Sequence, residues 1–241
     1  MTVDKRKVWV VTGGSRGFGR AVAERAARAG ARVAILARGP EVEAAARDIG
    51  GETIGLVADV CHAGSVAAAF KAIAERWGRI DVLVNNAGLH RGGLIEQIAE
   101  GDWSDVLATN LSGPFNTIRS ALPLMEKEGS IVNVGAVVGF RGFAGDVAYG
   151  TSKAGLAGMT QVLAVELARR GVRINLVVPG FVDTDMTAAL SARARARLLQ
   201  RIPLGRPGTL DEIAEVICWV AEARYMTGSI VATDGGLMCS L

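Results

Sequence analysis

The chain has 241 residues, of which 50% are hydrophobic and 21% are charged, an ordinary balance for a globular protein. Its net charge of +3 is small, and no basic patch with interleaved aromatic residues indicates nucleic-acid binding. No apolar run is long enough to span a bilayer, and no segment has the pattern of a signal peptide. We expect one domain over residues 1–241, a cytoplasmic location, and neither a nucleic-acid nor a membrane partner.

Predicted strands and helices alternate along the whole chain. Short apolar and β-branched runs predict strands at 8–11, 32–36, 53–58, 80–84, 130–134, 172–177 and 229–232. Helices are predicted at 20–29, 41–48, 65–77, 103–125, 148–169 and 186–201, and after a capping box at Thr209 and Glu212. We expect Gly113-Pro114 to bend the helix at 103–125. The alternation predicts the α/β class, a Rossmann-type, doubly wound parallel sheet of seven strands.

A glycine-rich loop directly follows the first predicted strand. Gly13, Gly17 and Gly19 have the spacing G-x-x-x-G-x-G, and a predicted helix begins at the end of the loop. Such glycines let the backbone approach a pyrophosphate, and the helix N-terminus offers N–H groups and a partial positive charge. The loop therefore predicts a dinucleotide site, and its position between strand and helix argues against a turn without a ligand.

The end of the second strand indicates which dinucleotide binds. An acidic residue there would accept a hydrogen bond from a ribose 2′-hydroxyl and repel a 2′-phosphate. This chain has Ala37-Arg38 and no acid, and a guanidinium can bind a phosphate with two hydrogen bonds. We therefore expect NADPH or NADP rather than NADH, although two solvated arginines, Arg38 and Arg16, would give the same pattern.

Tyr149 and Lys153 are four residues apart, a spacing that places both on one face of a helix. A cation beside a phenol stabilises the phenolate, and so lowers the tyrosine pKa from its usual value of about 10. Tyr149 would then act as an acid near neutral pH. The alternative is a helix with one exposed lysine and one half-buried tyrosine.

Three motifs occur together: the loop from Thr12 to Gly19, the turn from Asn85 to Gly88, and the Tyr149/Lys153 pair. This combination resembles the short-chain dehydrogenase/reductase family over nearly the whole chain, and most of all its β-ketoacyl-acyl carrier protein reductases. The resemblance implies an NADPH-dependent reduction of a ketone to a secondary alcohol. It also implies that Tyr149 protonates the carbonyl oxygen. Lys153 would hold the ribose and lower the Tyr149 pKa, while Asn110 would anchor a water that relays protons.

The resemblance assigns further residues to the site. The cofactor-binding residues that it implies are Gly13, Ser15, Arg16, Gly17, Phe18, Gly19, Arg38, Asp59, Val60, Asn86, Ala87, Gly88, Tyr149, Lys153, Pro179, Gly180, Val182 and Thr184. The substrate-binding residues that it implies are Ala136, Val137, Val138 and Phe181. We expect Phe181 and the segment 186–201 to form a lid, and we expect no metal.

One part of the family's active site is missing. The family places a serine thirteen residues before the tyrosine, and that position is Ala136. Losing one pre-placed donor to a developing oxyanion costs about 10²–10³ in rate. Three explanations stay open: an engineered substitution that traps a complex, a native enzyme that uses a substrate hydroxyl or a water instead, and an NADPH-binding protein without turnover.

The sequence leaves the substrate open between two classes. Arg170 and Lys127 resemble positions that dock an acyl carrier protein, but Glu126 and Glu128 flank Lys127 and would weaken contact with an acidic partner. The alternative is a ketone of secondary metabolism, such as a polyketide or another cyclic ketone. By resemblance we expect a homotetramer, or a homodimer, built through the two long helices and the last strand. For His90 we expect a packing role, or a place at the pocket mouth.

Overall fold

The computed structural model describes residues 6–183 and 191–240. Seven strands form one sheet in the order β3-β2-β1-β4-β5-β6-β7, and every neighbouring pair is parallel. The strands are β1 (Val8–Thr12), β2 (Arg32–Ala37), β3 (Glu52–Val57), β4 (Val82–Asn85), β5 (Ser130–Val134), β6 (Arg173–Pro179) and β7 (Ile230–Thr233). This strand order is the Rossmann order with one strand added, so the predicted fold class is confirmed.

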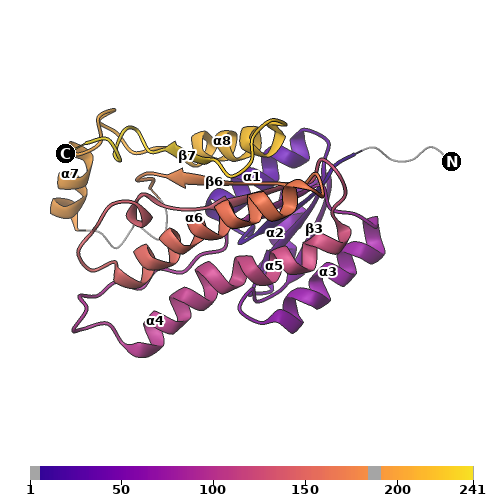
Figure 1. Ribbon diagram of the computed structural model, residues 1–241, viewed down its shortest axis with the longest axis horizontal. Coiled ribbons are helices and arrows are strands. Elements are labelled where there is room, and N and C mark those ends of the chain that lie inside the picture. The colour runs from indigo at the N-terminus through magenta and orange to yellow at the C-terminus, as the bar shows by residue number, and fades with distance from the viewer. Residues whose placement is uncertain (1–5, 184–190, 241) are drawn as a thin grey trace.

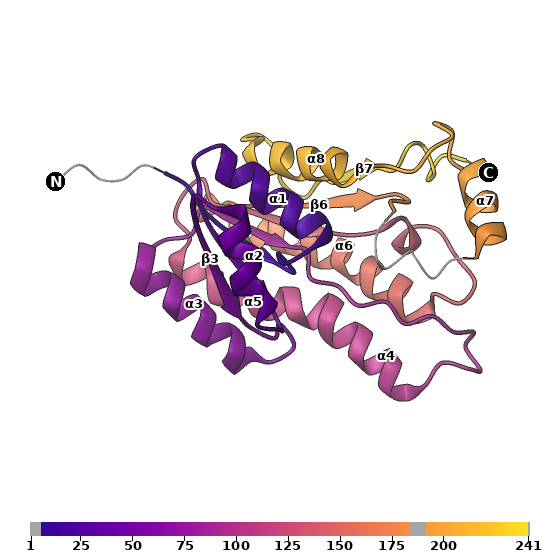
Figure 2. The ribbon, with the colours of Figure 1, turned by 180° about the vertical axis from the view of Figure 1, so that it is seen from behind.

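Helices cover both faces of the sheet (Figures 1 and 2). On one face lie α1 (Gly17–Arg28), α2 (Glu41–Ile49) and α8 (Leu210–Glu222). On the other face lie α3 (Ala63–Trp77), α4 (Glu100–Leu107), α5 (Gly113–Ala121) and α6 (Val147–Ala168). The short helix α7 (Ala192–Gln200) stands beyond the end of the sheet (Figure 1).

The two helical layers explain why the central strands are buried along their whole length and are mostly apolar. All residues of β1, β4 and β5 are buried, because side chains pointing to either face meet a helix. The edge strands β3 and β7 keep partly exposed residues, as expected for strands with one free edge. Within the described residues, no helix is long and apolar enough to cross a membrane, and no cluster of potential metal ligands occurs.

The helix predicted at 103–125 is not continuous. It is divided into α4, a π-helical turn η1 (Ala108–Ser112), α5 and a 3₁₀ turn η2 (Leu122–Leu124). We expected the irregularity at Gly113-Pro114, but α5 accommodates Pro114 in its first turn, where a proline removes no helical hydrogen bond. The π-turn lies just before it and contains Asn110. Such turns are frequent at functional sites.

Candidate active site

The glycine loop joins the end of β1 to the start of α1 with no room for side chains at two positions. A Cβ on Gly19 would lie 2.3 Å from the Gly13 carbonyl oxygen, and one on Gly13 would lie 3.0 Å from the Ala87 Cα. Gly17 differs, because it has a φ of +56° and nothing within 4 Å of its Cβ position. The backbone is therefore packed on its inner side and open at Gly17, the shape that a pyrophosphate cradle requires.

A second set of contacts fixes this loop to the turn that follows β4. The Thr12 hydroxyl oxygen accepts hydrogen bonds from the backbone N–H groups of Asn86 (3.1 Å) and Ala87 (3.0 Å). The Asn86 amide donates back to the carbonyls of Thr12 (3.0 Å) and Gly13 (3.2 Å). The side chains of Thr12 and Asn86 thus join the two loops and fix the position of the turn that is expected to contact the cofactor.

The charges around the loop suit a phosphorylated dinucleotide. Arg16 and Arg38 are both exposed, and the first turn of α1 contains no acidic residue that would compete with an anion. Asp59 follows β3, where its carboxylate accepts a hydrogen bond from the Cys61 N–H at 2.9 Å. The residues present therefore fit NADPH, with the glycine loop for the pyrophosphate and the two arginines for the 2′-phosphate.

Tyr149 and Lys153 lie on the first turns of α6, as their spacing predicted. The Lys153 Nζ lies 5.6 Å from the centre of the Tyr149 ring and donates a 2.8 Å hydrogen bond to the Val134 carbonyl at the end of β5. A Cβ on Gly88 would lie 3.8 Å from the Lys153 Nζ and 3.6 Å from the Asn110 Oδ1. The cofactor turn after β4 therefore lies close to both the lysine and the asparagine.

The protonation of this pair follows from burial. Burial lowers the pKa of Lys153 to about 8, so the amine is mostly protonated at neutral pH. Burial also raises the pKa of Tyr149 to about 12, and the Asp146 carboxylate acts in the same direction. We had expected Lys153 to lower the Tyr149 pKa. Among the protein's own groups, burial outweighs the effect of that cation.

Asn110 holds the loop after β4 through both ends of its amide. Its Oδ1 accepts from the Leu89 N–H at 2.7 Å, and its Nδ2 donates to the Leu89 carbonyl at 2.9 Å and to the Ser152 hydroxyl at 3.0 Å. Asn110 is fully buried. The π-turn directs this side chain toward the loop and α6, so Asn110 connects three segments of the site.

Ala136 lies between β5 and a 3₁₀ turn, η3 (Val137–Gly139), in an extended conformation that any residue adopts. The turn packs closely on α6, because a Cβ on Gly139 would come within 2.8 Å of the Lys153 backbone, and one on Gly150 within 3.0 Å of the Val138 carbonyl. Position 136 is thus beside the Tyr149/Lys153 helix, and it has no hydroxyl.

Comparison with known proteins identifies the family. Residues 13–238 match the family described as Enoyl-(Acyl carrier protein) reductase. The chain is 43% identical to the 3-oxoacyl-(acyl-carrier-protein) reductase of Homo sapiens, with 98% of this chain and 99% of that protein covered. It is 40% identical to the 3-oxoacyl-(acyl-carrier-protein) reductase FabG of Escherichia coli, with coverage of 96% and 97%. The chain belongs to the short-chain dehydrogenase/reductase family.

Solved structures of this family have the same fold. A blue fluorescent protein from a metagenomic library, solved in complex with NADPH, matches with a TM-score of 0.91 at 34% identity, covering 96% of this chain and 97% of that one. A Serratia marcescens short-chain dehydrogenase/reductase mutant also matches with a TM-score of 0.91, at 33% identity, covering 99% and 100%.

The residues expected to bind substrate fall into two groups. Val137 and Phe181 are buried in an apolar cluster with Leu156 and Ile202, so their side chains offer little surface to a ligand. Ala136 and Val138 are partly exposed and stay available. Thr184, which this short-chain reductase was expected to place at the nicotinamide, lies outside the described residues, as does the first part of the expected lid.

The described part of the lid, α7, is fastened by one of its arginines. The Arg195 guanidinium makes two hydrogen bonds to the Asp183 carboxylate, at 2.6 and 2.7 Å, and lies 5.4 Å from the centre of the Phe181 ring. Arg195 thus ties α7 to the segment after β6.

Two groups of polar residues in this family member were missed from the sequence. The first is a pair, His90 and Asp146, whose Nε2 and Oδ1 are 2.7 Å apart beside Tyr149. The second is a buried network that joins β4, β5, α5 and α6 through the side chains of Asn85, Asn133, Thr117 and Thr160. No spacing rule predicts either group, because its members come together only in the folded chain.

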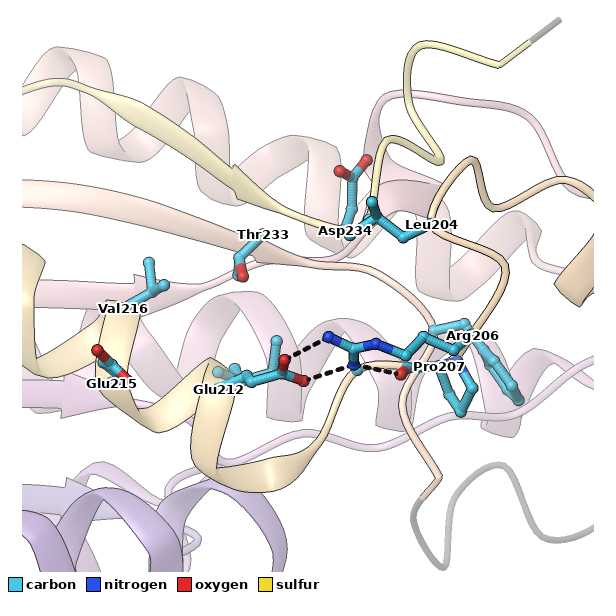
Figure 3. Close-up of a pocket in the computed structure, with 12 residues that line it drawn as sticks. Leu204, Arg206, Pro207, Glu212, Glu215, Val216, Thr233 and Asp234 are labelled. Atoms are coloured by element: carbon cyan, nitrogen blue, oxygen red, sulfur yellow. Dashed lines mark hydrogen bonds and ion pairs between the residues drawn. The ribbon is translucent and has the colours of Figure 1, made fainter.

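A separate cavity of about 280 Å³ lies between the start of α8 and the end of β7 (Figure 3). Arg206 and Glu212 form a bidentate ion pair in it, at 2.7 and 3.0 Å, and Glu212 also belongs to the predicted capping box with Thr209. Neither Tyr149 nor Lys153 lines this cavity. It is therefore distinct from the place where the reductase chemistry is expected.

Proposed function

We propose that this protein reduces a ketone to a secondary alcohol with NADPH as the hydride donor, and that a 3-oxoacyl thioester is its substrate. The observation that carries the proposal is that the cofactor turn lies next to Lys153 and Asn110. Gly88 of that turn is close to both side chains. Lys153 is on the same face of α6 as Tyr149. The names of the human and bacterial relatives support the thioester.

The residues divide the work of the reaction. The glycine loop and the α1 N-terminus bind the pyrophosphate, and Arg16 and Arg38 bind the 2′-phosphate. When bound, the nicotinamide supplies the hydride, and its oxidised form adds positive potential. Tyr149 gives its phenolic proton to the carbonyl oxygen as charge develops there. A protonated Lys153, held at the Val134 carbonyl, stabilises the phenolate that remains.

Position 136 provides the test. Ala136→Ser restores a donor at an extended, partly exposed position, and we expect the reduction rate to rise by about 10²-fold. The absorbance of NADPH is followed with a 3-oxobutanoyl thioester, a cyclic ketone and a 2-enoyl thioester, for both forms of the protein. Turnover of the 3-oxobutanoyl thioester supports the proposal. No turnover in either form, with NADPH bound, supports a binding protein instead.

A cyclic ketone is the second candidate substrate because of where the expected docking cations lie. Lys127 precedes β5 and Arg170 precedes β6, whereas the site follows the ends of these strands. The five residues of β5 alone span roughly 17 Å. Arg170 also donates a 2.6 Å hydrogen bond to the Leu122 carbonyl. A carrier protein docked at these cations is at the N-terminal ends of the strands, whereas Tyr149 of the same chain lies near their C-terminal ends.

We propose a homotetramer, with a homodimer as the alternative. Apolar residues are exposed on two of the surfaces expected to form its interfaces: Val162 and Val165 on α6, and Ile230 on β7. Sedimentation of the protein at micromolar concentration tests this assembly, and a monomer alone contradicts it.

A further inference from the structure

His90 and Asp146 form a hydrogen-bonded pair at the edge of the proposed reaction centre. His90 lies in the loop after β4, and Asp146 immediately precedes α6. Their side chains meet at 2.7 Å, and both are partly exposed. The two segments are also joined through their backbones, because the Gly93 N–H donates to the Gly145 carbonyl at 2.8 Å. The pair is therefore a fixed part of the structure.

The Asp146 side chain does not cap helix α6, although its position favours this. It is the N-cap residue of α6, where an aspartate side chain ordinarily accepts a hydrogen bond from the first turn of the helix. No such side-chain bond is present at α6. The carboxylate instead binds His90, so the interaction that it would make locally has been replaced by one with a distant loop.

The imidazole reaches Tyr149 in turn. The two ring centres are 5.0 Å apart and the ring planes are at 85°, the edge-to-face arrangement that aromatic pairs prefer. Lys153 also approaches this ring, with its Nζ 5.6 Å from the ring centre. Tyr149 thus contacts both the imidazole and the lysine, while position 136 has no hydroxyl to orient it.

We propose that His90, held by Asp146, is a positioning residue for Tyr149, and that this pair sets the charge next to the phenol. The inference rests on the proposed function, in which Tyr149 is the acid. In this proposal, His90 and Asp146 help to orient the Tyr149 side chain, as a serine at position 136 would. His90 acts through Tyr149 and is not itself the proton donor.

The charges around the pair fix the sign of each substitution. Tyr149 has Lys153 near it on α6, Asp146 just before that helix, and His90 on the loop after β4. The guanidinium of the neighbouring Arg91 lies 3.5 Å from the Asp102 carboxylate and donates a 3.5 Å hydrogen bond to the His90 carbonyl. The Asp146 carboxylate raises the Tyr149 pKa. We expect the hydrogen bond that His90 donates to this carboxylate to weaken that effect. Removing the carboxylate charge should lower the Tyr149 pKa, and removing the His90 donor should raise it.

The changes in the Tyr149 pKa can be measured in this chain without any substrate. It has only two tyrosines, and Tyr225 is fully exposed, so Tyr225→Phe leaves Tyr149 as the sole tyrosine. Uniform incorporation of fluorotyrosine, whose phenol is more acidic, then gives one fluorine signal to titrate by NMR. Asp146→Asn keeps the shape of the side chain and its N-cap preference. His90→Phe keeps a ring against Tyr149 and removes the donor. His62→Phe, at the exposed second histidine of the chain, is the control.

We expect Asp146→Asn to lower the titration midpoint at position 149 by roughly one pH unit. His90→Phe should raise it, and His62→Phe should leave it unchanged. Any other combination for the first two variants, including a shift in only one of them, overturns the inference. The proposed function fails by a separate outcome, namely that no ketone is reduced, so the two failures are distinguishable.

Discussion

The glycine loop and the surroundings of Tyr149 both lie at the C-terminal ends of the strands, but they are built in different ways. The loop is held mainly by backbone groups, and a Cβ at Gly19 would lie 2.3 Å from the Gly13 carbonyl oxygen. The Tyr149 ring is contacted by the side chains of His90, from the loop after β4, and of Lys153, from its own helix. Asn110, from the π-turn, binds Ser152 on the same helix. The first region depends on the absence of side chains, and the second on their chemistry. Substitutions should therefore affect cofactor binding in one region and the reaction step in the other.

The largest expected effect is on the reaction step. Tyr149→Phe should reduce the rate of ketone reduction by 10²–10⁴-fold, the loss expected on removing a general acid. NADPH affinity should stay nearly the same, because the hydroxyl contributes little to cofactor binding. Tyr225→Phe, at the fully exposed second tyrosine, is the matched control. A rate above about a tenth of the parent's, far outside that range, would remove Tyr149 from the mechanism.

The next effect is on cofactor choice. Arg38→Asp should reverse the preference for NADPH over NADH, since a charge-assisted hydrogen bond contributes about 1.5–3 kcal/mol and the new carboxylate repels the 2′-phosphate. Fluorescence titration of both cofactors with the parent and the variant measures the change. If the parent binds NADH as tightly as NADPH, the assignment of Arg38 to the phosphate fails.

A smaller effect is expected from one methyl group in the loop. Gly19→Ala places a Cβ against the Gly13 carbonyl, and overpacking of this kind typically costs about 1–3 kcal/mol. NADPH should therefore bind about 10-fold more weakly, as measured by titration. Gly101→Ala is the control, because that exposed glycine in the first turn of α4 has nothing within 4 Å of its Cβ position. Equal affinities in the two variants would show that the loop tolerates a side chain.

The remaining expected effect is on stability and its pH dependence. Burial lowers the Lys153 pKa from its ordinary value of 10.5 to about 8, so the unfolded chain binds more protons between these two values. The free energy of unfolding should therefore rise with pH in this window, by up to about 3 kcal/mol from this group. Lys153→Met should remove the rise, while abolishing activity. Denaturant unfolding of the parent and of Lys153→Met at pH 8 and pH 10 measures this rise. If the free energy of unfolding rises equally in both proteins, Lys153 is not a buried amine with a lowered pKa.

The backbone-built region was largely predictable from the sequence. Gly13, Gly17 and Gly19 carry the geometry in their own identity and spacing, and the apolar runs of the strands set the parallel sheet. The Tyr149/Lys153 pair was predictable for the same reason, since both residues lie within one helical turn of each other. The π-turn at Asn110 was not, because the contacts that stabilise it come from Leu89 and Ser152, distant in sequence.

The region built from side chains could be predicted only in part. His90 and Asp146 are 56 residues apart, and neither lies in a motif, so their contact depends on how the loop after β4 meets the start of α6. Phe181 shows one reason, because an aromatic residue after β6 can face a ligand or the core, and the sequence does not distinguish these; in the structure Phe181 is buried and also lines the cavity near α8. The Tyr149 pKa shows the same limit, since burial is a property of the folded chain.

The central claim is that hydride passes from NADPH to a ketone at the Tyr149 site. The most direct measurement uses NADPH deuterated at the reactive carbon of its nicotinamide, a 3-oxobutanoyl thioester and the unmodified protein, with the product analysed by mass spectrometry. We predict a 3-hydroxybutanoyl thioester with one deuterium on the carbinol carbon, and none with Tyr149→Phe over the same time. NADPH that is bound, yet yields no deuterated alcohol after prolonged incubation with either the parent or Ala136→Ser, would contradict the claim.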